Sequence, residues 1–387
     1  MNGSSVSAAS PRDRRLFDPG PKRILALDGG GVRGVVALAF LKRIEETLAE
    51  EAGRPVRLCD YFDLIGGTST GAIIGVALAL GLSVDQIRAF YRELAPMVFR
   101  PPWVKVPGWK ALFDARALSR ELHAVIGDRR LDSADLQTGI GVMLKRLDTA
   151  SAWILTNNPR SKYWETPADH AYIGNRHYRL AQIVRASAAA PHYFDPQEIE
   201  IAEGEHGLFV DGGLTPHNNP SLALFLAATL PGYGLGWEAS PETLSIVSVG
   251  AGSFRDRIDP NALKKRFSAT LALRAMVQQI GENQQLILTL MSFFGEGRTR
   301  WEINSEIGDL SATPPPRGAL FRFLRYDIKL EAGWFQQEIG VAVGPEEIRR
   351  MRRLDDASSI PLLEELSAKA AQRQVLREHW GPPVAKA

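Results

Sequence analysis

The sequence predicts an α/β protein in which strands and helices alternate along the chain. Two segments, residues 23–51 and 62–82, carry this prediction, because each combines a short apolar run, a glycine-rich turn and a helical pattern of apolar residues. The chain has 387 residues, of which 45% are hydrophobic and 23% charged, so it can bury a sizeable core. This composition excludes a disordered chain.

The first segment starts with an apolar run over 23–27 that ends in Asp28 and three glycines, which is typical of a buried strand and a tight turn. Apolar residues then recur at helical spacing over 35–51. The second segment has a strand over 62–65, another glycine-rich turn and an apolar helix over 71–82. That helix is shorter than the roughly 18–20 residues of a membrane span, so we interpret it as buried.

The same criteria predict the later elements. A helix is expected near Pro220, because Asn218 and Asn219 suit a helix cap and proline suits the first turn. Further strands are expected at 140–147, 152–156, 207–210, 243–249 and 320–329, and further helices at 259–294, 345–354 and 360–379.

We divide the chain into three parts. Residues 1–22 are rich in Ser, Pro and Arg and lack the apolar stretch of a signal peptide, so we predict a disordered tail there. Residues 23–255 are expected to form a catalytic core, and 256–387 a helical C-terminal elaboration packed on the same domain.

Charge and cysteine content exclude several classes of protein. The net charge of +2 argues against a dedicated nucleic-acid binder, which is expected to be strongly basic. The single cysteine, Cys59, excludes an intramolecular disulfide and a cysteine-based zinc site, which fits a reducing, cytoplasmic compartment.

The turn after the second strand fits the nucleophile-elbow pattern G-x-S-x-G. Ser69 would occupy a strained strand-to-helix turn, and Gly67 and Gly71 are required because a Cβ at either position would collide with the neighbouring element. A purely structural glycine-rich turn is the alternative.

Residues 28–34 (DGGGVRG), here called the glycine loop, precede the first helix. Successive glycines expose backbone N–H groups to an anion, and in acyl transfer such groups form an oxyanion hole. Arg33 adds a positive charge there, or pins the loop through a salt bridge to a carboxylate. The first, third and fourth glycines also fit the dinucleotide-binding pattern G-x-G-x-x-G. Against that alternative, the second strand ends in a serine turn rather than an acidic residue, and Asp28 would place a carboxylate near a pyrophosphate.

A carboxylate also follows the predicted strand over 207–210. Asp211 lies where open α/β sheets present functional groups, and it either accepts the proton of Ser69 directly or only stabilises a turn. Of the seven histidines, only His217 and His379 follow Asp211, as the triad of an α/β-hydrolase requires. His217 lies in the same loop and His379 in a polar terminal helix, so a Ser–Asp pair fits the sequence better than a triad.

The motifs together resemble those of the patatin-like phospholipase family, bacterial branch. They occur in the order of that family: DGGGVRG at 28–34, GTSTG at 67–71, ASAAAPHYF at 186–194, DGG at 211–213 with NNP at 218–220, and SVGAG at 248–252.

This resemblance implies a three-layer fold, with a central, mostly parallel sheet between helices, and hydrolysis of phospholipid acyl esters without metal or other cofactor. It implies that Ser69 is the nucleophile and Asp211 the general base in a two-step acyl transfer. We expect partial burial to raise the pKa of Asp211 from its usual value near 3.9. The oxyanion hole is assigned to the backbone of Gly29, Gly30, Gly31, Arg33 and Gly34.

The sequence also gives expectations about what the protein binds and where it acts. The Trp-, Lys- and Pro-rich stretch within 101–113 is either an interfacial loop or a set of packing anchors. Some bacterial members of the family are antiphage effectors switched on by a cyclic nucleotide, and basic residues within 253–353 either bind its phosphates or face solvent. We expect a cytoplasmic enzyme associated with the inner face of the membrane, and leave open a homo-oligomer. An inactive lipid- or nucleotide-binding protein on the same fold is the rival interpretation.

Overall fold

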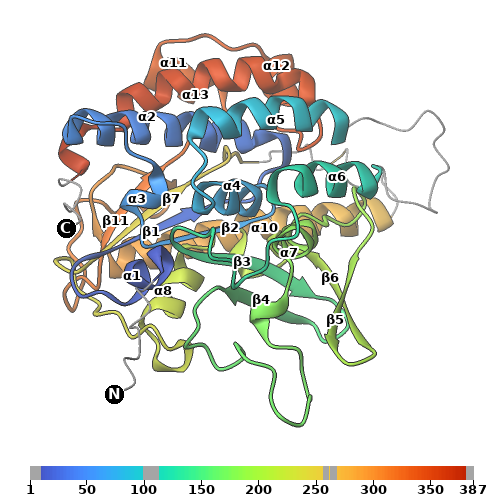
Figure 1. Ribbon diagram of the computed structural model, residues 1–387. Coiled ribbons are helices and arrows are strands. Elements are labelled where there is room, and N and C mark those ends of the chain that lie inside the picture. Colours follow the sequence, from blue (N-terminus) through green and yellow to red (C-terminus); the bar gives the residue numbers. More distant parts are fainter. Residues whose placement is uncertain (1–9, 99–112, 256–260, 262–267, 381–387) are drawn as a thin grey trace.

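Figure 1 shows the computed structural model of the chain, which describes residues 10–98, 113–255, 261 and 268–380. Its centre is a nine-stranded sheet with the order β5-β6-β3-β2-β1-β7-β11-β8, in which β4 also pairs with β3. The strands are β1 (Lys22–Leu27), β2 (Leu64–Thr68), β3 (Gly139–Arg146), β4 (Ser151–Thr156), β5 (Gln197–Ala202), β6 (Glu205–Asp211), β7 (Leu244–Val249), β8 (Glu296–Gly297) and β11 (Arg322–Tyr326). A separate antiparallel pair is formed by β9 (Glu302–Asn304) and β10 (Gly308–Asp309).

The sheet is mostly parallel. All pairings from β3 through β2, β1, β7 and β11 to β8 are parallel. The antiparallel pairings are confined to β3, β4, β5 and β6.

Helices cover both faces of the sheet. In Figure 1, α2, α5, α11, α12 and α13 lie above the sheet, and α1 and α8 lie below it. The helices are α1 (Pro11–Phe17), α2 (Gly34–Ala52), α3 (Leu58–Tyr61), α4 (Thr70–Ala79), α5 (Val84–Val98), α6 (Ala115–Ile126), α7 (Leu180–Ser187), α8 (Ser221–Thr229), α10 (Ser268–Phe294), α11 (Ala332–Ile339), α12 (Pro345–Met351) and α13 (Ile360–Gln374).

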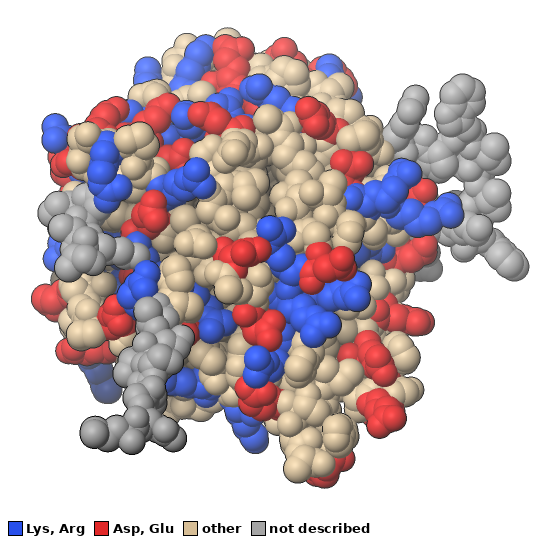
Figure 2. Space-filling model, in the orientation of Figure 1, with Lys and Arg blue, Asp and Glu red and all other residues tan. Residues whose placement is uncertain are grey.

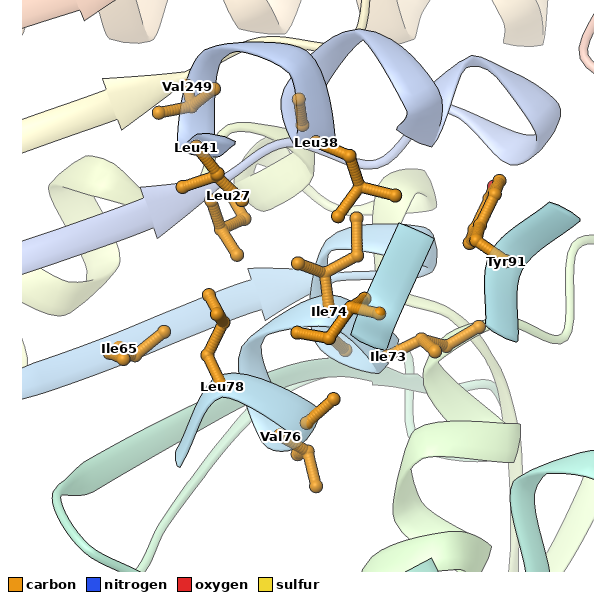
Figure 3. Close-up of a cluster of buried hydrophobic side chains, with 14 of the residues drawn as sticks. Leu27, Leu38, Leu41, Ile65, Ile73, Ile74, Val76, Leu78, Tyr91 and Val249 are labelled. Atoms are coloured by element: carbon orange, nitrogen blue, oxygen red, sulfur yellow. The ribbon is translucent and has the colours of Figure 1, made fainter. Parts of the chain in front are cut away.

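Two hydrophobic cores result, because side chains alternate across a strand. On β1, Leu25 and Leu27 face the core shared with α2 and α4, part of which is drawn in Figure 3. Ile24 and Ala26 face the second core, shared with α1, α8 and α10. This three-layer arrangement confirms the predicted fold class.

The predicted disordered tail over 1–22 is wrong from Ser10 onward. The Ser10 side chain accepts a hydrogen bond from the backbone N–H of Asp13, and Pro11 occupies the first turn of α1. Leu16 is only 1% exposed and belongs to the second core. Its carbonyl oxygen accepts a hydrogen bond of 2.9 Å from Nε1 of Trp237. The prediction of a tail rested on the polar composition of this segment, but Leu16 and Phe17 at the end of α1 are apolar.

The strand expected at 320–329 is present as β11, which pairs with β7, so the C-terminal third adds a strand to the main sheet as well as helices. The remainder of the proposed division into three parts stays a prediction. Within the part of the chain described here, no helix is both long and apolar enough to cross a membrane.

Candidate active site

Two strands end next to each other on one edge of β3. β4 pairs along one edge of β3, and β2 and β6 share the opposite edge. The last residue of β2, Thr68, pairs with Met143, and the last residue of β6, Asp211, pairs with Leu144. Because β2 is parallel and β6 antiparallel to β3, their C-terminal ends run towards each other. This register brings Ser69 and Asp211 together from positions far apart in the sequence.

Ser69 occupies the sharp turn between β2 and α4. Its φ of 54° and ψ of −122° lie outside the regions that most L-residues adopt. A Cβ on Gly67 would lie 2.1 Å from the carbonyl carbon of Gly71, and a Cβ on Gly71 would lie 2.2 Å from the carbonyl oxygen of Leu27. Both glycines of the pattern are therefore required by packing, as the sequence analysis expected.

A hydroxyl group that the sequence analysis did not single out supports this turn. The side chain of Ser187, at the end of α7, accepts a hydrogen bond of 2.9 Å from the backbone N–H of Ser69. The same hydroxyl donates a hydrogen bond of 2.7 Å to the carbonyl oxygen of Met143. Ser187 lies within the motif ASAAAPHYF, but its role depends on contacts with two distant strands, which a local motif does not reveal.

Asp211 is buried, and its carboxylate lies close enough to the side chain of Ser69 for that side chain to help lower its pKa. Its Oδ1 also accepts a hydrogen bond of 2.7 Å from the backbone N–H of Gly213. Burial raises the pKa of Asp211 to about 6, and the hydrogen bonds from Gly213 and Ser69 act in the opposite direction. The expected rise in this pKa is therefore present, and the carboxylate is paired with the serine without an intervening side chain.

The glycine loop lies beside this pair, and its amides differ in their partners. The N–H of Gly29 donates to the carbonyl oxygen of Asn218 at 3.1 Å, and the N–H of Arg33 donates to that of Gly30 at 3.1 Å. The N–H of Gly34 donates to the carbonyl oxygen of Gly31 within the short 3-10 helix that begins α2.

Two amides of the loop remain available. Among the described residues, the N–H groups of Gly30 and Gly31 donate to no protein acceptor. Of the five predicted positions, these two therefore have amides available to a ligand anion. Gly31 has a φ of 57°, and a Cβ there would lie 2.4 Å from the carbonyl oxygen of Leu354, so glycine is required at this position.

Arg33 pins the loop, but through a backbone carbonyl rather than a carboxylate. Its Nη1 donates a hydrogen bond of 3.0 Å to the carbonyl oxygen of Gly252, and its guanidinium lies 5.4 Å from the ring of Phe254. Burial lowers the pKa of Arg33 to about 10. No carboxylate among the described residues is within ion-pairing distance of it, so the salt-bridge alternative is wrong.

Neither of the two histidines that follow Asp211 is bonded to it or to Ser69. Nδ1 of His217 is buried without a hydrogen-bond partner in the described chain, and burial lowers the pKa of this imidazole. Nδ1 of His379 lies 2.8 Å from the hydroxyl of Tyr326, the last residue of β11.

Ser69, Asp211 and the three successive glycines line one cavity of about 570 Å³. Apolar side chains from several helices and loops form much of the remaining wall: Ile73 on α4, Leu94 and Val98 on α5, Leu118 on α6, Phe194 and Leu214 in loops, and Val277, Ile280 and Leu288 on α10. Within the described ranges, no group of three His, Cys, Asp or Glu side chains is arranged to hold a metal ion.

The basic residues predicted to bind a nucleotide are largely paired with acids. Arg255 lies 3.5 Å from Glu302, and Lys329 lies 2.6 Å from the same side chain. Figure 2 shows acidic and basic side chains interspersed over one face of the molecule. Most of the Trp-, Lys- and Pro-rich stretch within 101–113, and the basic residues Arg257, Lys264, Lys265 and Arg266, lie outside the described residues.

Comparisons with known proteins extend these observations. The chain matches a sequence model described as patatin-like phospholipase over residues 25–225. It is 31% identical over 263 residues to a protein of Escherichia coli described as a cUMP-AMP-activated phospholipase, covering 68% of this chain and 74% of that protein. It is 28% identical over 276 residues to a cGAMP-activated phospholipase of Escherichia coli (strain TW11681), covering 70% of this chain and 72% of that protein. Among solved structures, human GIVD cytosolic phospholipase A2 aligns with a TM-score of 0.42 and 12% identity over 93% of this chain and 60% of that one.

Proposed function

The chain belongs to the patatin-like phospholipase family and is a lipid acyl hydrolase, and from this premise we propose that it cleaves acyl ester bonds of membrane phospholipids through Ser69 and Asp211. The observation that carries the proposal is that Ser69 and Asp211, whose side chains interact, line the same cavity. A nucleophile and a base close together, next to free backbone amides, are the parts that acyl transfer needs.

The reaction proceeds in two steps. As Oγ of Ser69 attacks the carbonyl carbon of the ester, its proton moves to the carboxylate of Asp211. The negative charge on the carbonyl oxygen is stabilised by the N–H groups of Gly30 and Gly31. When the tetrahedral intermediate collapses, the leaving alkoxide takes the proton from Asp211 and departs as a lysophospholipid. Water, deprotonated by Asp211, then attacks the acyl-enzyme. When the second tetrahedral intermediate collapses, Asp211 returns the proton to Oγ of Ser69 and the fatty acid is released.

The cavity supports a lipid as the substrate. Side chains such as Ile73, Leu94 and Leu118 present an apolar wall to whatever enters it. An acyl chain placed along such a wall leaves water, which supplies binding energy in proportion to the apolar area that it buries.

The proposal is tested with vesicles of phosphatidylethanolamine and phosphatidylglycerol that carry labelled acyl chains. Ser69→Ala and Asp211→Asn are each expected to abolish fatty-acid release. The matched controls Ser119→Ala and Asp169→Asn, at exposed positions, are expected to release fatty acid like the wild type. Near-normal release by either site variant contradicts the dyad. A folded wild type that binds vesicles but releases no fatty acid, with or without cyclic di- and trinucleotides, supports the inactive lipid-binding alternative.

We further propose that a cyclic nucleotide activates the enzyme, as part of an antiphage response in the cytoplasm. The support is that two Escherichia coli relatives are described as activated by cUMP-AMP and by cGAMP. Arg255 and Lys329 line the cavity, although both are paired with Glu302. Fatty-acid release is expected to be low alone and to rise with one member of a panel of cyclic di- and trinucleotides. Equal release across the panel contradicts this regulation.

We propose that α10 carries the contact with the membrane. Val277 and Leu288 line the cavity, and Val277, Leu286 and Phe293 of the same helix are exposed. Exposed apolar side chains on a helix that also lines the cavity suit a lipid surface. Leu286→Glu combined with Phe293→Glu is expected to reduce sedimentation with vesicles and leave hydrolysis of a soluble ester unchanged. Unchanged sedimentation contradicts the proposal, and a change in oligomeric state instead identifies the surface as a contact between copies of the chain.

A further inference from the structure

A buried cluster of charges lies next to the glycine loop. Nη2 of Arg325, on β11, donates hydrogen bonds of 2.7 Å to Oδ2 of Asp28 and 2.7 Å to Oδ2 of Asp327. Arg325 and Asp28 are each 2% exposed, and Asp327 is 0% exposed. Arg325 and Asp327 lie outside residues 25–225, the part of the chain that matches the family.

The direct contacts of this cluster leave polar groups unsatisfied. One guanidinium contacts two carboxylates, with the Arg33 guanidinium acting on Asp327 only at longer range, and Oδ1 of Asp28 has no hydrogen-bond partner among the described residues. Burial raises the pKa of Asp28 to about 6, against the opposing effect of Arg325. Removing charges from water costs free energy, and a buried ion cluster is often no more stabilising than apolar side chains of similar size. Stability alone is therefore a weak reason for this cluster.

The cluster is joined to both ends of the glycine loop. At the start of the loop, Asp28 directly precedes Gly29. Near the end of the loop, the link runs through Gly252. Oδ1 of Asp327 accepts a hydrogen bond of 2.8 Å from the N–H of Gly252, and the carbonyl oxygen of Gly252 accepts a hydrogen bond of 3.0 Å from Nη1 of Arg33. A Cβ on residue 250 would lie 2.1 Å from Cγ of Asp327, so the turn that carries Gly252 is fitted closely to this carboxylate.

Arg33 completes the connection, because its own N–H donates to the carbonyl oxygen of Gly30. A continuous chain of hydrogen bonds thus runs from Arg325 through Asp327, Gly252 and Arg33 to Gly30. The free amides of Gly30 and Gly31 lie between two points at which Arg325 holds the loop. One is the chain of hydrogen bonds through Asp327, Gly252 and Arg33, and the other is the hydrogen bond to Asp28. The direction of the two free N–H groups therefore depends on where Arg325 holds the carboxylates of Asp28 and Asp327.

We propose that Arg325 and Asp327 are positioning residues that hold the amides of Gly30 and Gly31 towards the developing oxyanion. This inference rests on the proposed function, because it assigns a role within the same reaction. An oxyanion hole acts on the transition state more than on the bound ester. Loss of the positioning residues is therefore expected to lower kcat and to leave KM almost unchanged.

The test compares Arg325→Met with Arg322→Met, which removes an exposed arginine from the same strand. Kinetics are measured on a soluble thioester or nitrophenyl ester, with the concentration of active sites titrated by a fluorophosphonate that labels Ser69. Arg325→Met is expected to lower kcat by about 10- to 100-fold, the size of effect that a misplaced catalytic group produces. Arg322→Met is expected to match the wild type.

A second readout separates positioning from general damage. A trifluoromethyl ketone adds to the serine and places an oxyanion in the hole, whereas the matched methyl ketone stays mostly unreacted. In Arg325→Met, inhibition by the trifluoromethyl ketone is expected to weaken by the same factor as kcat, with inhibition by the methyl ketone unchanged. A merely structural role lowers thermal stability or active-site concentration and leaves the ratio of the two inhibition constants as in the wild type.

Asp327→Asn is a milder variant, because it keeps an acceptor for Gly252 and removes one buried charge. It is expected to fold and to show an intermediate loss in kcat and in the inhibitor ratio. Normal kcat and a normal ratio in folded Asp327→Asn overturn the inference even if Arg325→Met does not fold. Failure of the proposed function has a different result: the wild type itself then hydrolyses no ester and does not react with the fluorophosphonate.

Discussion

Replacing Asp211 with asparagine is expected to stabilise the protein while abolishing hydrolysis. The carboxylate is buried, and its pKa of about 6 exceeds the usual value of 3.8 because burial disfavours the charged form. Asparagine has the same size and keeps an oxygen that accepts the hydrogen bond from Gly213, but it carries no charge and cannot take the proton of Ser69. The substitution therefore removes both the base and the cost of burying its charge.

The magnitude follows from the difference between the folded and unfolded pKa. Between the usual value of 3.8 and about 6, the folded protein holds a proton on Asp211 that the unfolded chain has lost, so the free energy of unfolding falls as pH rises through this window. The difference between 3.8 and about 6 corresponds to about 3 kcal/mol, reached above the folded pKa. At pH 5 the effect is about half as large.

The assay is urea unfolding of Asp211→Asn and wild type at pH 5 and pH 8. The variant is expected to be more stable at both, by about 3 kcal/mol at pH 8 and about half of that at pH 5, less any loss from a poorer contact of the amide with Ser69. Asp28, whose pKa is also raised to about 6, titrates in both proteins and cancels in the difference. An advantage that is absent, or that does not grow between pH 5 and pH 8, refutes the reasoning. In the wild type, kcat/KM is expected to fall about tenfold per pH unit below about 6, as the base becomes protonated.

Three further substitutions test the surroundings of the pair. Gly31→Ala is expected to lower kcat on a soluble ester by at least about 100-fold, because its Cβ would lie 2.4 Å from a backbone oxygen; Gly53→Ala, at a φ of 62° in open space, is expected to leave kcat unchanged. Leu118→Trp should shift hydrolysis from palmitoyl towards butyryl esters by filling the cavity, and an unchanged chain-length profile would remove α6 from the acyl site. Leu16→Ala should lower the free energy of urea unfolding by about 2–5 kcal/mol, and a loss below about 1 kcal/mol would show that α1 contributes little to the core.

Local patterns were sufficient for the first two strand–turn–helix units. The run over 23–27 and the helix over 35–51 correspond to β1 and α2, and the apolar helix over 71–82 to α4. These elements were accessible because their apolar periodicity, glycine turns and helix starts lie within a few residues of one another. The strand β5 and the helix α7 were not predicted, although α7 supplies Ser187 to the candidate site.

The detailed chemistry of the glycine loop depended on contacts that no local pattern contains. Nothing in the sequence distinguished the five amides. In the structure, however, the N–H of Gly29 donates to the carbonyl oxygen of Asn218, which is far away in the sequence. Likewise a salt bridge to a carboxylate was one of two interpretations of Arg33, and instead its guanidinium donates to the carbonyl oxygen of Gly252. Hydrogen-bond partners of a loop are set by tertiary packing, so the sequence predicted the loop and its function class but not which amides are free.

The register of β6 explains why this site has a serine and a carboxylate close together. In an all-parallel sheet, neighbouring strands end side by side, about 4.8 Å apart, and groups at their ends are separated across the sheet. Here β2 and β6 lie end to end along one edge of β3, with Thr68 and Asp211 opposite the consecutive residues Met143 and Leu144. Their ends approach along the strand direction, so the carboxylate of Asp211 and the side chain of Ser69, the residue after Thr68, come to line the same cavity. A carboxylate proposed to act as a base without an imidazole needs a raised pKa, and burial raises the pKa of Asp211 to about 6. The proposed Ser–Asp pair and the expected pH dependence of activity thus both follow from the pairing of an antiparallel β6 with β3.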